Sequence, residues 1–284
     1  MKLDSTSIIT AFYPLQYSIH SIAQYRAWIQ NFCKIPSFMI IFTDETYALE
    51  IYQWRRTFLD KTNIIIKPFN SFAMTCASMM NFWKKQVTLD PEHGSPELYA
   101  MWALKQELVR IAINQNIFQS TWFIWCDIGI QRFSHLQKYY MTFPSDVDRL
   151  CAPGRISFLE VDKIPSKFVD TFNESKPLEL PIPEITLGSG CIVGDAYAWQ
   201  DFGEAYKNML KEFALRGWFA GKETSVFFAI LMEKKTKPFR LFYAKKFVDI
   251  KGIEWMSFPV MLGGIIDAEL DTRFEPPVED YKSL

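Results

Sequence analysis

The sequence predicts an α/β protein in which a mainly parallel central sheet is flanked by helices. Two observations carry this prediction. Short runs of apolar and β-branched residues alternate along the chain with longer segments whose apolar residues have helical spacing. In addition, the run from Trp122 to Cys126 contains no charged residue, as is typical of a strand that helices cover on both faces.

Composition limits the class of protein. The chain has 284 residues, of which 49% are hydrophobic, so it can build the core of one globular domain. A net charge of −1 gives no general attraction for nucleic acid, which we exclude as the main partner. Five dispersed cysteines without a Cys-x-x-Cys pair indicate reduced thiols and neither a disulfide framework nor a zinc site.

Targeting signals are the next constraint. The first residues lack the basic start and long apolar run of a signal peptide. No apolar stretch reaches the ~18 to 20 residues that a membrane span needs. We therefore predict no membrane span and a cytoplasmic protein, either free or peripheral to a membrane.

The first third of the chain predicts three strands joined by helices. The expected elements are a strand at 7–13, a helix at 21–32, a strand at 38–42, a helix at 45–58 and a strand at 64–69. Strands joined in this way are parallel and have right-handed crossovers. Residues 74–87 are compatible with either a helix or an aromatic loop.

The remaining elements follow in order. Pro96 and the glutamate after it favour a helix start, and this helix leads into the central strand. A Pro-rich link at 177–183 divides a single domain into halves at 1–176 and 177–284. The other expected elements are strands at 156–161, 188–196 and 239–243, an amphipathic helix at 199–216 and an apolar helix at 226–232.

Carboxylates follow several of the predicted strands. Asp44, Asp127 and Asp195 each end an apolar run. In open α/β sheets, ligands bind beyond the carboxyl ends of the parallel strands. The alternative for each residue is that its side chain caps a turn or the next helix.

The segment Trp125-Cys126-Asp127-Ile128-Gly129 resembles the metal-binding strand end of GT-A type glycosyltransferases. Those enzymes have an Asp-x-Asp motif there, and Gly129 replaces its second acid. The Trp-x-Asp-x-Gly pattern is more similar to the HtrL/YibB family. The resemblance implies a GT-A-like (Rossmann-like) fold and a nucleotide-diphosphate sugar donor, with UDP as the expected nucleotide. It also implies a glycan or glycolipid acceptor and a divalent cation, Mn²⁺ or Mg²⁺, held by Asp127.

The resemblance also implies donor-binding residues. At the end of the first strand, Thr10, Phe12 and Tyr13 are expected to lie along the nucleoside, and Thr43 and Asp44 near the base. The cations expected to offset the diphosphate charge are Lys105, Arg132 and Lys222. Simpler roles remain open for them. The aromatic residues suit the core, Asp44 suits a helix cap, and the cations suit solvent or pairing with nearby acids.

Two residues are candidates for catalysis. In the resemblance, Gly221-Lys222-Glu223 corresponds to the loop-to-helix start at which inverting GT-A enzymes place their general base. A helix N-terminus favours an ionised carboxylate, which suits Glu223 for this role. Asp195, in the Gly-rich segment on the acceptor side, is the second candidate. The alternatives are a retaining transferase and a non-catalytic nucleotide- or glycan-binding protein with a degenerate metal site.

Overall fold

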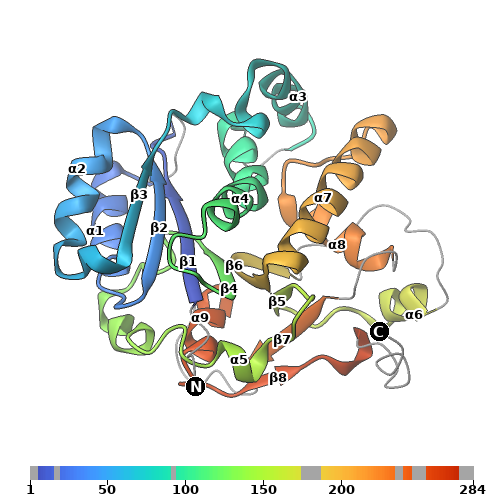
Figure 1. Ribbon diagram of the computed structural model, residues 1–284. Coiled ribbons are helices and arrows are strands. Elements are labelled where there is room, and N and C mark those ends of the chain that lie inside the picture. The colour runs from blue at the N-terminus through green and yellow to red at the C-terminus, as the bar shows by residue number, and fades with distance from the viewer. Residues whose placement is uncertain are drawn as a thin grey trace.

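An eight-stranded mixed sheet forms the centre of the computed structural model, which describes residues 6–15, 20–90, 94–173, 187–233, 239–244 and 254–274 (Figure 1). The strands β6 and β8 run against their neighbours, and the other strands share one direction. The α/β prediction is therefore confirmed. In spatial order the strands are β3 (Thr62–Ile66), β2 (Phe38–Thr43), β1 (Thr6–Phe12), β4 (Trp122–Cys126), β6 (Leu187–Asp195), β5 (Ser157–Glu160), β7 (Arg240–Ala244) and β8 (Ala268–Leu270).

The order of the strands reverses at β1. The chain first adds β2 and β3 on one side of β1 and then returns to place β4 on the other side, parallel to β1. The loops after β1 and β4 consequently leave the same edge of the sheet. This topological switch point is where open α/β sheets form a ligand crevice.

Strand β6 brings a distant segment to the same edge. It pairs antiparallel with β4, so that Cys191 lies opposite Cys126 and Asp195 lies opposite Trp122. The beginning of β6 therefore lies beside the carboxyl end of β4. Its end, with Asp195, lies at the opposite edge of the sheet.

Helices cover both faces of the sheet (Figure 1). Among the described residues, no helix is long and apolar enough to cross a membrane. One face carries α3 (Ala77–Val87), α4 (Pro96–Gln115), α6 (Ser166–Asn173), α7 (Ala196–Arg216) and α8 (Glu223–Met232), and the other carries α1 (Ile22–Phe32), α2 (Glu45–Trp54), α5 (Val147–Leu150) and α9 (Phe258–Leu262).

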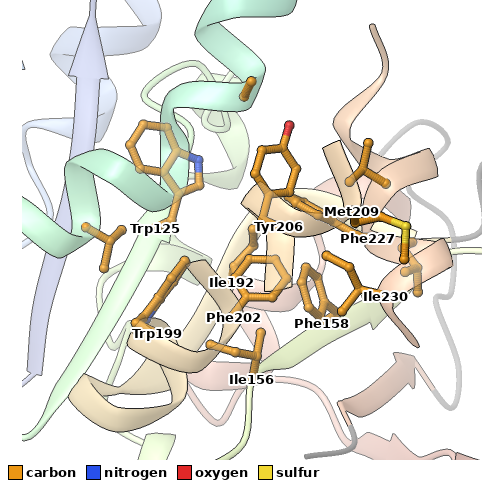
Figure 2. Close-up of a cluster of buried hydrophobic side chains, with 14 of the residues drawn as sticks. Trp125, Ile156, Phe158, Ile192, Trp199, Phe202, Tyr206, Met209, Phe227 and Ile230 are labelled. Carbon is orange, nitrogen blue, oxygen red and sulfur yellow. The ribbon is translucent and has the colours of Figure 1, made fainter. Parts of the chain in front are cut away.

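The central strand contributes to both resulting cores. Phe123 and Trp125 face the α4, α7 and α8 side, whereas Ile124 and Cys126 face the α1 and α9 side. This alternation explains why the strand has no polar position. Figure 2 shows Phe202 of α7 packed beside Phe158 of β5 on one side and Trp199 of α7 on the other. Burial of each such side chain contributes about 1.5–3 kcal/mol.

The structure corrects several predicted boundaries. The helix expected at 45–58 ends at Trp54, because Arg55 leaves the helix and its buried guanidinium donates to backbone carbonyl oxygens, including that of Ile35 at 2.6 Å. The apolar helix expected at 226–232 is α8, and it begins three residues earlier, at Glu223. Residues 77–87 are a helix, which settles the open choice there. The Pro-rich link at 177–183 lies outside the described residues.

The two halves expected on either side of that link share one sheet. Strand β5 comes from the first half, and its neighbours β6 and β7 come from the second. The sequence did not predict the short elements α5, α6 and β8. A site built at the sheet edge can therefore draw residues from both parts of the chain.

Candidate functional site

A cleft of about 660 Å³ opens at the carboxyl ends of β1 and β4. Its walls come from segments far apart in the sequence: the ends of both strands, the start of β6, helix α4, the start of α8 and the short helix at Glu254–Met256. Phe12, Lys105, Asp127, Ser189 and Glu223 are among the lining residues. The cleft thus occupies the position that the switch point of the sheet predicts.

Lys105 connects three of these segments. Its ammonium nitrogen, Nζ, lies 2.9 Å from Oε1 of Glu223 and 3.3 Å from Oδ1 of Asp127. It also donates to the carbonyl oxygen of Ser189 at 3.0 Å. The Lys105 side chain is only 3% exposed, so helix α4 holds a fixed positive charge between two carboxylates.

Asp127 is held by two contacts of its carboxylate and one of its backbone. Oδ1 accepts a hydrogen bond from Nε1 of Trp125 at 2.7 Å in addition to the contact with Lys105. The backbone N–H of Asp127 donates to the carbonyl oxygen of Gly190 at 2.8 Å, which joins β4 to β6. The other oxygen, Oδ2, faces the space beside Gly190, where an added Cβ would lie 3.5 Å away. Asp127 therefore presents one oxygen to the cleft.

Glu223 is the first residue of α8 and is almost completely buried. Its Oε1 accepts hydrogen bonds from Lys105 and, at 2.7 Å, from the hydroxyl of Ser189. Both donors fix the orientation of this oxygen. Among the described residues, these hydrogen bonds all go to Oε1, so Oε2 is the oxygen that can accept a proton from a ligand in the cleft.

The charge of Lys105 is secure. Burial lowers the pKa of the Lys105 amine, but the carboxylates of Asp127 and Glu223 outweigh burial, and the net pKa lies above its usual value. Lys105 is therefore an ammonium at neutral pH. With it, the charged residues of the cleft are three cations (Lys105, Arg132, Lys222) and two carboxylates (Asp127, Glu223), a net charge of +1.

Aromatic residues form the wall on the β1 side. The rings of Phe12 and Tyr25 lie 5.9 Å apart, and Tyr25 makes an edge contact with Trp28 at 5.3 Å. The guanidinium carbon of Arg132 lies 5.0 Å from the centre of the Trp28 ring. Gly129 passes close to the same ring, because a Cβ there would lie 3.4 Å from it. This wall combines flat apolar surface with a cation that the Trp28 ring positions.

The structure brings together most of the residues that the sequence singled out. Seven of them line the cleft: Phe12, Tyr13, Lys105, Asp127, Arg132, Lys222 and Glu223. The ammonium of Lys105 bridges the carboxylates of Asp127 and Glu223 in this cleft. Arg132 and Lys222 are the other cations of the lining.

Four predicted site residues are not among those that line the cleft. Asp44 caps α2 by accepting from the backbone N–H of Thr46 at 2.9 Å, and Asp195 caps α7 in the same way. Asp195 also accepts from the backbone N–H of Gly154 at 2.6 Å, at the opposite edge of the sheet. Thr10 is buried, and the buried Thr43 donates to the carbonyl oxygen of Phe12 at 3.0 Å. For both aspartates, the capping alternative describes what the structure shows.

Two residues that hydrogen-bond to the charged groups of the site were not predicted. Ser189 contacts both Lys105 and Glu223, and Trp125 donates to Asp127. A sequence signal existed for Trp125, since residues two apart in a strand face the same side. Ser189 stands between two glycines, but its role depends on the pairing of β6 with β4, which the sequence does not specify.

The oxygen atoms of the site determine whether it can hold the divalent cation that the resemblance implies. Mn²⁺ and Mg²⁺ require several oxygen ligands. Asp127 offers only Oδ2 and Glu223 only Oε2, because Oδ1 and Oε1 are bonded to the Lys105 ammonium, and that positive charge lies between the two carboxylates. Within the described ranges, no group of three potential metal ligands occurs. The described residues do not fit a resident cation.

Comparisons with known proteins assign no family to this chain. No family model matches the sequence, and no curated protein matches it either, so the resemblance to the HtrL/YibB family is not confirmed. Among solved structures, the chain is similar to mouse xyloside xylosyltransferase 1 in its apo form. The sequences are 13% identical over 81% of each chain, with a TM-score of 0.38. A likeness of this extent carries no argument about the site.

Proposed function

We propose that this chain is a glycosyltransferase that moves a sugar from a nucleoside diphosphate sugar to a hydroxyl of a glycan or glycolipid. UDP is the nucleotide we expect. The observation that carries the proposal is the position of a buried, charge-paired glutamate in a cleft at the topological switch point. Such crevices bind nucleotides, and a fixed carboxylate can take the proton of an attacking hydroxyl.

The wall on the β1 side suits the nucleotide. The rings of Phe12 and Tyr25 provide flat surface for a base. Arg132, held over Trp28, provides a planar guanidinium that can donate two parallel hydrogen bonds to phosphate. Residues 13–20, which follow β1, contain no glycine. They therefore do not form a Gly-rich phosphate loop of the dinucleotide-binding type.

Glu223 acts as the general base in the proposed reaction. Oε2 accepts the proton of the acceptor hydroxyl while its oxygen forms a bond to the anomeric carbon. The bond from that carbon to the diphosphate oxygen breaks, and the nucleoside diphosphate leaves with the electron pair. This displacement inverts the anomeric configuration. Lys105 and Ser189 hold Oε1, so the base keeps one orientation during the reaction.

The test uses a panel of UDP-sugars. Release of UDP and transfer of sugar to oligosaccharide acceptors are measured for the wild type and for Glu223→Gln. Glu45→Gln is the matched control, because Glu45 is likewise the first residue of a helix but is exposed. We expect UDP release with the wild type and the control, and loss of release with Glu223→Gln.

Other results would redirect the proposal. A protein that binds UDP but releases none from any donor is a nucleotide-binding protein and not a transferase. Retention of the anomeric configuration in the product, read from the proton NMR spectrum, would contradict the assignment of Glu223 as base. If no nucleotide changes the thermal stability of the protein, the proposed function is refuted.

A further inference from the structure

We propose that this cleft binds the nucleoside diphosphate without a divalent cation, because the Lys105 ammonium supplies the positive charge between the two carboxylates. The inference rests on the proposed function and makes it more specific. It concerns how the charge of the diphosphate is compensated, which the sequence resemblance assigned to Mn²⁺ or Mg²⁺.

The bonding of Lys105 favours binding without a divalent cation. An ammonium has three N–H donors, and four oxygens surround Nζ: the carbonyl and hydroxyl oxygens of Ser189 at 3.0 and 3.3 Å, Glu223 at 2.9 Å and Asp127 at 3.3 Å. The side chain is 3% exposed and comes from the middle of α4. Lys105 is therefore a buried and fully bonded part of the site.

The net charge of the cleft also favours binding without a divalent cation. Two carboxylates alone would repel a diphosphate and would require a cation between them. With Lys105 in place, the residues that line the cleft carry a net charge of +1. Arg132 and Lys222 belong to this lining and can approach the diphosphate directly. The cleft can accept an anion with the charges it already has.

Gly129, which stands in place of the second acid of an Asp-x-Asp motif, removes one possible metal ligand. At the position where an Asp-x-Asp motif would place another carboxylate, Gly129 packs its backbone close to the Trp28 ring. A Cβ there would lie 3.4 Å from Trp28 and 3.9 Å from Tyr25. The sequence change and the position of Lys105 both reduce the number of oxygens offered to a metal.

Binding of UDP to the wild type tests the inference directly. Calorimetric titrations are run in buffer with EDTA and in buffer with MnCl₂. We expect the two dissociation constants to differ by less than about tenfold, equivalent to about 1.4 kcal/mol. Binding that requires Mn²⁺ overturns the inference and leaves the proposed function intact. Absence of UDP binding in both buffers overturns the proposed function and the inference together.

A second measurement needs no nucleotide. Lys105→Met leaves Asp127 and Glu223 without their shared cation, and Lys84→Met, on the exposed side of α3, is the control. Binding of Mn²⁺ is followed by electron paramagnetic resonance. We expect Lys105→Met to bind Mn²⁺ at least about tenfold more tightly than the wild type and the control. Equal Mn²⁺ affinity of all three proteins overturns the role given to Lys105. If the variant does not fold, the UDP titrations of the wild type decide.

Discussion

Removal of the Lys105 ammonium is the most informative perturbation of this protein. Lys105→Met keeps the apolar stem in α4 but leaves Glu223, whose side chain is 5% exposed, without its cation. Loss of one partner of a buried ion pair costs about 3–5 kcal/mol. The low end applies here, because Ser189 still donates to Glu223 and the Asp127 side chain is 41% exposed. We expect the free energy of unfolding to fall by about 3 kcal/mol.

Urea denaturation followed by tryptophan fluorescence measures this change. The double variant Lys105→Met/Glu223→Gln removes both charges, so it should lose less stability than the two single variants together, by about 1–2 kcal/mol. Two results would refute the reasoning. One is a Lys105→Met protein within about 0.5 kcal/mol of the wild type, and the other is strict additivity in the cycle.

Three further substitutions test the other carboxylates. Glu223→Gln should lower kcat of sugar transfer by about 10²–10⁴ with little change in UDP affinity, and an unchanged kcat would remove its role as base. Asp195→Ala should lower the free energy of unfolding by about 1 kcal/mol through loss of the α7 cap, with kcat unchanged; a fall in kcat would contradict this. Burial raises the pKa of Glu160 from 4.5 to about 7, so the folded state holds this proton more tightly than the unfolded state. The contribution of Glu160 to stability should be greatest below a pH of about 4.5 and should fall by about 2 kcal/mol, after solvent screening, as the pH rises through about 7. Glu160→Gln should abolish this fall in urea denaturation curves, and a persistent fall would assign it to another group.

The sequence predicted the elements whose signal is local. The apolar run of β4 and the Ser95-Pro96 start of α4 each specify their own structure, because period and capping act within a few residues. The short elements α5 and β8 have no such signal, since they contain four and three residues and depend on packing against the rest of the chain.

The candidate site was predicted in part for the same reason. Asp127 and Asp195 both follow an apolar strand, so the sequence treats them alike. They differ in the direction of the strand that carries them. The antiparallel pairing of β6 with β4 places Asp195 at the opposite edge, where it caps α7. Strand direction depends on the pairing partner, and no residue within β6 encodes it.

The pairing of Lys105 with Glu223 joins residues 118 positions apart, and it explains how one cleft can be built from distant segments. Two carboxylates brought to the same sheet edge would repel each other and separate α8 from β4. The ammonium from α4 reverses the sign of that interaction, so the charge network stabilises the arrangement of the three elements. Since Lys105 occupies Oδ1 of Asp127 and Oε1 of Glu223, the second oxygen of each carboxylate has a fixed position at the cleft. A base fixed in this way needs little reorganisation when a substrate binds, which is what proton transfer in an enzyme site requires.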